Sequence, residues 1–166
     1  MEVLEKWFAA NLSQFISKEA VVFIISMIPI LELRGGLVAA SLLKIPETVS
    51  IPICIIGNII PIPFILLFIR KIFQLMKKTK LFHGLIVKLE NRAMGKSDRI
   101  KKYEFLGLVL FVGIPLPGTG AWTGALIASL LDIDIKKSSL AILIGILMAS
   151  VIMYVVSYLL VGNIVS

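Results

Sequence analysis

Residues 105–131 read FLGLVLFVGIPLPGTGAWTGALIASLL, a run of 27 residues that contains no charged side chain. A helix rises about 1.5 Å per residue and needs roughly 20 apolar residues to cross a bilayer core of ~30 Å, so this run is long enough to span. Its middle, IPLPGTG at 114–120, contains the prolines and glycines that interrupt helices. The run therefore predicts two short apolar helices separated by a break at membrane depth.

The composition of the whole chain excludes a water-soluble globule. Hydrophobic residues make up 58% of the 166 residues and charged residues 16%, and the mean hydropathy is +1.01. Soluble proteins are roughly 45–50% apolar and about 25% charged. We therefore predict an all-α integral membrane protein that forms a single membrane domain over residues 1–166. The single cysteine, Cys54, and the lack of a Cys/His cluster predict no disulfide, no metal and no cofactor.

Three further apolar runs accompany the first. Two of them, uncharged over 22 and 29 residues, are long enough to span and predict transmembrane helices at 48–69 and 138–162. The third has only 12 residues before it meets Glu32 and Arg34, so it cannot span without placing both charges deep in the bilayer. For this segment we predict a second Pro/Gly-broken hairpin, at 19–43.

The chain also contains an internal repeat. The sequence GLVAASLLKI (36–45) matches GALIASLLDI (124–133) at six of ten positions, with an offset of 88. The offset persists downstream, and a two-residue gap upstream sets Pro29 against Pro115. We predict two repeats, each a broken hairpin followed by a transmembrane helix: 19–69 with its hairpin at 19–43, and 105–166 with its hairpin at 105–131.

The orientation of these repeats depends on whether the broken segments cross the bilayer. If they cross, the repeats run parallel and both termini are cytoplasmic; if they dip in and return, the repeats are inverted and both termini lie outside. The distribution of basic residues fits both cases equally well. We favour re-entrant hairpins in inverted repeats, because irregular backbone at membrane depth must be buried in protein, and two breaks entering from opposite faces would meet near the midplane.

Two amphipathic segments flank the first repeat. Residues 1–18 predict a helix lying in the membrane interface, because apolar side chains recur there at helical spacing: Leu4, Phe8, Leu12 and Phe15. Residues 70–104 form a basic amphipathic segment, and 11 of the 17 basic residues lie between positions 70 and 102. This segment predicts a cytoplasmic surface on a multi-pass protein of the cell (inner) membrane, held to anionic lipids. Nucleic acid is not an expected partner, because no aromatic stacking platform accompanies the charge.

The candidate site begins with Glu32 and Arg34. A charge at the bilayer centre costs ~2.5–3.5 kcal/mol on insertion scales, so both need mutual pairing or a hydrated cavity. One interpretation is a structural ion pair that braces the hairpin tip. In the functional interpretation, Arg34 binds an anionic group while Glu32 pairs with it or exchanges a proton. Gly35 and Gly36 would let backbone N–H groups approach a ligand.

The second broken segment supplies further candidates. Its turn would expose backbone amides and two hydroxyl groups, and Trp122 is either a wall of a ligand site or an interfacial anchor. Asn58, inside the first predicted transmembrane helix, either lines the cavity or bonds to a neighbouring helix. The remaining candidates are Pro117, Gly118, Thr119, Gly120 and Thr123.

No pattern of an enzyme site is present. The chain has no nucleophile with a nearby His, no Walker pattern and no paired acidic cluster, so we predict that it is not an enzyme. Without an ATP site, active transport would draw on an ion gradient, with H⁺ or Na⁺ as the coupling ion.

Two motifs, ELRGG (32–36) and PLPGTGAWTGALIASLL (115–131), resemble the small multidrug export family, with similarity from about Val21 to Leu160. This resemblance implies efflux of small toxic compounds. The paired broken segments also resemble the broader DedA/VTT group, which implies lipid handling. In that group a basic residue typically follows the second Pro-Gly, whereas Thr119 stands here, which leaves Arg34 to supply an anion-binding charge. The residues after Gly35 also depart from the Ala-Ile-Pro expected in relatives of the export family.

Three functions follow from these observations. The leading hypothesis is an ion-gradient-driven exporter of small molecules, with a midplane site at the tips of two re-entrant hairpins. The first alternative is a DedA-like translocase or scramblase of an anionic lipid such as a polyprenyl phosphate. The second is a membrane scaffold that transports nothing. Because each hairpin and span offers little buried area alone, we also expect a homodimer.

Overall fold

The structure is a computed structural model that describes residues 16–77, 84, 87–88, 91 and 98–161. The described residues form helices joined by short turns, and none of them forms a strand. The predicted interfacial helix at 1–18 lies outside the described residues except for its last three positions. Much of the predicted basic segment at 70–104 also lies outside them.

The first broken segment forms two short antiparallel helices, α2 (Lys18–Met27) and α3 (Glu32–Leu42). The Ser17 side chain accepts a hydrogen bond from the Ala20 N–H at 3.2 Å and caps the start of α2. The turn between the helices contains Ile30 at φ 80° and ends at Glu32, which has φ 51°. A helix of 10 or 11 residues is about 15 Å long, which is half of a bilayer core.

The second broken segment has the same plan. Helix α7 (Asp98–Gly113) ends just before the Pro/Gly turn, and α8 (Ala121–Leu130) begins just after it. Gly118 and Gly120 have φ 73° and 140° in this turn, so the chain reverses through left-handed backbone that glycine adopts without strain.

Two long apolar runs complete the fold. Helix α4 (Glu47–Ile59) continues after Ile60 into α5 (Pro61–Lys77), and α9 (Ile135–Tyr154) continues into a π-helix, η1 (Val155–Val161). The parts over Glu47–Ile69 and Ile135–Tyr158 have 23 and 24 residues, enough to cross a membrane. Their outer faces expose large apolar side chains, such as Phe64 at 63% and Val151 at 65%. Such exposure suits lipid rather than water, so this is an all-helical membrane protein with two apolar helices long enough to span.

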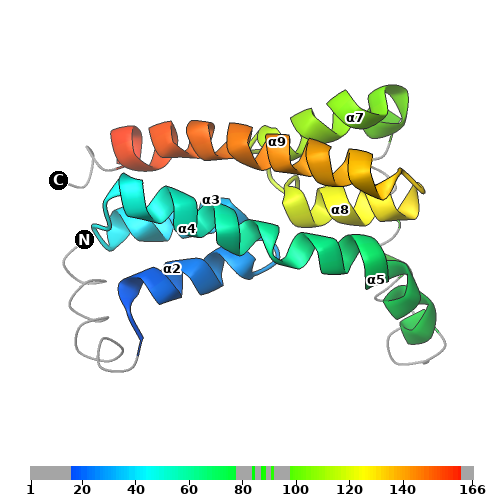
Figure 1. Ribbon diagram of the computed structural model, residues 1–166, viewed down its shortest axis with the longest axis horizontal. Coiled ribbons are helices and arrows are strands. Elements are labelled where there is room, and N and C mark those ends of the chain that lie inside the picture. Colours follow the sequence, from blue (N-terminus) through cyan, green and yellow to red (C-terminus); the bar gives the residue numbers. More distant parts are fainter. Residues whose placement is uncertain (1–15, 78–83, 85–86, 89–90, 92–97, 162–166) are drawn as a thin grey trace.

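The two long runs lie antiparallel over the length of the molecule, and each hairpin occupies one half of that length (Figure 1). Helices α2 and α3 pack on α4 in one half, while α7 packs on α9 and α8 on α5 in the other. The turns of both hairpins therefore lie at the middle of the molecule. Figure 1 also shows that α2 begins, and η1 ends, at the end of the molecule opposite to the end of α5.

Helices α3 and α8 terminate in the same way. The residue after each helical cap is left-handed, Lys44 at φ 55° and Asp132 at φ 59°. The next amide then bonds back into the helix, from Ile45 N–H to Ala40 O at 3.0 Å and from Ile133 N–H to Ala128 O at 3.1 Å. Both ends have the hydrogen bonds of a Schellman motif, and they lie 88 positions apart in the chain.

Candidate functional site

Glu32 is the first residue of α3 and lies where the two turns meet. Its side chain is buried, with 5% of its surface exposed, and its backbone is left-handed at φ 51°. A non-glycine residue in that conformation costs about 1–3 kcal/mol, and such strain persists only where surrounding contacts hold it. The contacts that hold Glu32 come from the other hairpin.

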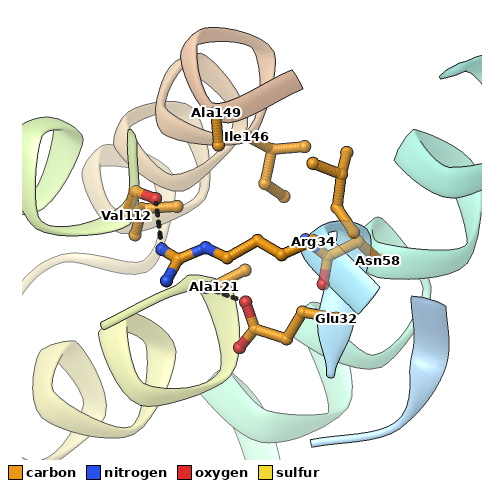
Figure 2. Close-up of a pocket in the computed structure, with 8 residues that line it drawn as sticks. Glu32, Arg34, Asn58, Val112, Ala121, Ile146 and Ala149 are labelled. Atoms are coloured by element: carbon orange, nitrogen blue, oxygen red, sulfur yellow. Dashed lines mark hydrogen bonds between the residues drawn. The ribbon is translucent and has the colours of Figure 1, made fainter. Parts of the chain in front are cut away.

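The Glu32 carboxylate caps the start of α8 (Figure 2). Its two oxygens accept hydrogen bonds from the Ala121 and Trp122 N–H groups, each at 3.0 Å, and Figure 2 shows the bond to Ala121. Gly120, at the cap position of α8, has no side chain that could do this, and a Cβ built on it would overlap the Glu32 carboxylate. A negative charge at a helix start is favourable because the helix dipole is positive there.

Arg34 occupies the complementary position at the end of α7. Its guanidinium donates to the carbonyl oxygens of Leu116 at 2.7 Å, Ile114 at 3.3 Å and Val112 at 3.4 Å. It also donates to Thr119 Oγ1 at 3.1 Å. The Val112 carbonyl group lies in the last turn of α7, at the negative end of the helix dipole, so a cation is stabilised here.

The two charged side chains thus contact helix ends rather than each other. Figure 2 shows both side chains extending from α3 toward the second hairpin, Arg34 to the carbonyl group of Val112 and Glu32 to the N–H of Ala121. No ion pair between them is formed in the described part of the chain. The bracing ion pair considered from the sequence is replaced by two charge–backbone contacts that join the hairpins. Both charged groups thus have hydrogen-bond partners from the second hairpin.

The Thr119 hydroxyl group stabilises the conformation of the second turn. Its hydroxyl oxygen accepts from the Leu116 N–H at 3.3 Å and lies 2.8 Å from the Leu116 carbonyl oxygen. Together with its bond from Arg34, this places Thr119 at the centre of the turn. Pro117 and Gly118 lie in the same turn and are exposed.

A narrow crevice lies between the hairpin tips and the long helices. It is too small in this conformation to admit a water molecule. Asn58 lines it with 3% of its surface exposed, and its Oδ1 atom has no hydrogen-bond partner. The full lining comprises Glu32, Leu33, Arg34, Asn58, Val112, Ala121, Ile146 and Ala149.

Other candidates from the sequence lie elsewhere. A Cβ on Gly36 would overlap Ser26 Oγ and come within 2.9 Å of Cys54 Sγ, so Gly36 allows α3 to pack closely on α2 and α4. A Cβ on Gly35 would come within 2.9 Å of Leu31 Cβ, in the preceding turn. Neither glycine lines the crevice, and neither does Thr123, which is half-buried on α8.

Trp122 contributes its backbone to the site and its ring to a different surface. The indole lines an apolar groove of about 520 Å³ along α5, and its Nε1 atom is buried without a partner. Besides Trp122, the groove is lined by Met27, Ile60, Pro61, Phe64, Ile65, Phe68, Ile69 and Ile72.

The sequence predicted exposed backbone amides in the second turn, but not which backbone groups bind Glu32 and Arg34. These are the amide of Ala121 and the carbonyl groups of Val112, Ile114 and Leu116. All are backbone groups, which no side-chain pattern could identify. The available signal was the break itself, because it leaves helix ends without partners.

The fold and the site define a helical membrane protein in which charges from one broken segment hold the turn of another. Residues 32–152 match the family described as "Putative small multi-drug export protein". This match covers more than half of the chain, so the protein belongs to that family. No curated protein and no solved structure matches the chain significantly. The family description and the apolar helices together indicate a membrane export protein rather than an enzyme.

Proposed function

We propose that the protein is an ion-gradient-driven exporter of small molecules, with its site at the tips of two re-entrant hairpins. The observation that carries this proposal is the reciprocal contact between the hairpins: Glu32 binds the start of α8 and Arg34 binds the end of α7. These bonds must break when the tips separate. They therefore stabilise the closed conformation of a gate formed by the two hairpin tips.

Re-entrance and inversion are supported by the backbone. Each arm of the first hairpin is about half a bilayer long, and the hairpins approach each other from opposite ends of the molecule. The left-handed residues of the described chain fall into three pairs that are 88 positions apart: Ile30 and Gly118, Glu32 and Gly120, Lys44 and Asp132. This register keeps the same offset through the break and pairs Pro29 with Pro117, so the two-residue gap that set Pro29 against Pro115 is unnecessary.

The coupling ion in this proposal is a proton on Glu32. A carboxylate accepts from both α8 amides because it is charged and has free lone pairs on both oxygens. Protonation removes the charge and turns one oxygen into a donor, so the proton competes with the cap. A proton gradient could in this way drive opening of the tips.

Efflux from proteoliposomes tests the proposal. Vesicles containing the full chain and loaded with ethidium are given a pH gradient of either sign, and dye release is followed by fluorescence. We expect release driven by the gradient, and Glu32→Gln should reduce this gradient-driven release about tenfold or more, because a glutamine amide cannot bind and release the coupling proton. The matched control is Glu47→Gln, at the exposed start of α4. Gradient-independent release, or equal release by both variants, would contradict proton coupling at Glu32.

The second candidate is a DedA-like translocase of an anionic lipid such as a polyprenyl phosphate. It is supported by Arg34 and by the helix start beside it, both of which suit an anionic headgroup. The same vesicles with a fluorescent anionic lipid in one leaflet distinguish the two, since the translocase would move the lipid and leave ethidium in place. A scaffold would move neither compound.

A further inference from the structure

Two helices begin at the centre of the molecule, and only one of them has a cap. Helix α8 receives the Glu32 carboxylate on the amides of Ala121 and Trp122. At the start of α3 no side chain forms a cap. The Glu32 N–H bonds to Ile28 O at 3.0 Å and the Gly35 N–H to Leu31 O at 2.7 Å, whereas the amides of Leu33 and Arg34 have no acceptor among the described residues.

Asn58 is a second, independent group without a partner at the same place. It lies on α4, is 3% exposed, and lines the crevice together with Leu33 and Arg34. Its Oδ1 atom has no hydrogen-bond partner, and the two ends of an Asn amide can exchange by rotation. Figure 2 shows its amide beside the start of α3. A buried polar group without a partner destabilises the fold by about 1–3 kcal/mol, and by more in an apolar surrounding. The amides of Leu33 and Arg34 and the Asn58 side chain therefore destabilise the fold unless a ligand forms hydrogen bonds with them.

The other repeat shows which chemical group fits a helix start at this position. Under the offset of 88, Leu33 and Arg34 correspond to Ala121 and Trp122, whose amides bind a carboxylate. The residue that corresponds to Glu32 is Gly120, which has no side chain. The chain therefore supplies a carboxylate to α8 and none to α3.

We propose that the start of α3, with Asn58, binds the oxyanion group of anionic compounds that the protein transports, such as a carboxylate or a phosphate. A cation such as ethidium would be transported without occupying this site. The amides of Leu33 and Arg34 and the rotated Asn58 amide donate to it, in the way that Ala121 and Trp122 donate to Glu32. The crevice is too narrow for this group in the conformation described, so binding requires the tips to separate. This inference rests on the proposed exporter function for its role in transport.

Fluorescence of Trp122 tests binding indirectly, because its amide is bound by Glu32 at the site while its indole lies in the adjoining groove. The chain has two tryptophans, so Trp7→Phe leaves Trp122 as the single reporter, with its amide bound by Glu32. Purified full-length protein is titrated with benzoate and, as matched compounds, with benzyl alcohol and benzylamine. Dihexanoyl phosphatidic acid and dihexanoyl phosphatidylcholine form a second pair, which distinguishes a lipid headgroup from a free carboxylate. Thermal unfolding of the same samples gives a second measure of binding.

We expect saturable binding of benzoate or of the phosphatidic acid, and none of the neutral, cationic or zwitterionic compounds. Asn58→Leu should weaken binding about tenfold, which corresponds to one lost hydrogen bond to a charged group. The same variant should unfold at a higher temperature without ligand, because it removes a buried polar group that has no partner. A purely structural Asn58 would give the opposite shift. The control is Ile59→Leu, at the next position on α4, which should change neither property.

Equal binding of benzoate and benzylamine, or binding that Asn58→Leu leaves unchanged, would overturn the inference. The ethidium assay separates this result from failure of the proposed function. Efflux without anion binding would retain the exporter and reject the oxyanion site. Anion binding without efflux of any compound would retain the site and reject the exporter.

Discussion

Glu32 and Arg34 are the two charges that the membrane would ordinarily exclude, and each is held by backbone groups from the other hairpin. The carboxylate faces the positive end of a helix and the guanidinium faces carbonyl oxygens, so both charges have the sign that their surroundings favour. Their positions are therefore not interchangeable.

Exchanging the two charges tests this conclusion. The double variant Glu32→Arg, Arg34→Glu would place a cation on the amides of α8 and an anion on the carbonyl groups of Val112 and Leu116. We expect it to be less stable than either single variant, by about 1–3 kcal/mol, because each exchanged charge opposes its helix end. The measurement is the free energy of unfolding in mixed detergent micelles. If the two side chains instead stabilised each other directly, the double variant would recover the stability lost in the single variants.

At the scale of elements, the start of α8 depends on a residue that lies 89 positions earlier in the chain. Gly120 leaves room for the Glu32 carboxylate because it has no Cβ, and its φ of 140° is accessible to glycine. The turn of the second hairpin and the start of the first are thus one unit. Neither can move alone without leaving helix ends without partners.

Gly120→Ala is expected to break this unit. The added Cβ would overlap the Glu32 carboxylate, and the alanine would have to adopt a positive φ that glycine tolerates better. Together these effects should lower the free energy of unfolding by about 2–3 kcal/mol. We expect a lower unfolding temperature and loss of gradient-driven dye efflux. Gly84→Ala is the matched control, because a Cβ at Gly84 would meet no atom within 4 Å. Wild-type stability of Gly120→Ala would show that Glu32 does not cap α8.

At the scale of the whole molecule, the arrangement of the hairpins makes a prediction about membrane topology. Helix α2 begins and η1 ends at one end of the molecule, and α5 ends at the other (Figure 1). If the hairpins are re-entrant and the basic segment is cytoplasmic, both termini lie outside the cell membrane.

A C-terminal reporter checks this topology. We expect a fused alkaline phosphatase to be active and a fused green fluorescent protein to be dark, while a reporter site inserted at Gly84 reads as cytoplasmic. Reporters that place both Gly84 and the C-terminus in the cytoplasm would refute re-entrance, because broken segments that cross the bilayer give that result. The predicted homodimer is a separate matter, and it is checked by the mass of the protein in nanodiscs.

Much of the fold could be predicted from the sequence, for physical reasons. The length of an uncharged run decides whether a helix can span, and the Pro/Gly turn at 114–120 marks where a helix must stop. The sequence match at an offset of 88 was visible, but it did not extend through the break. There, the correspondence of Glu32 with Gly120 rests on their left-handed backbone, because the two residues differ in type. The interruption between α4 and α5 occurs at Pro61, inside a stretch predicted as one helix.

The site was only partly predictable. The sequence by itself singled out Glu32 and Arg34, because charge inside an apolar run is costly wherever it occurs. Only the tertiary structure decided what they bind, because their partners are amide and carbonyl groups 78–90 positions away in the chain. Every residue except proline carries the same N–H and C=O groups, so the identity of a residue does not show which of these groups the fold brings within reach of Glu32 and Arg34.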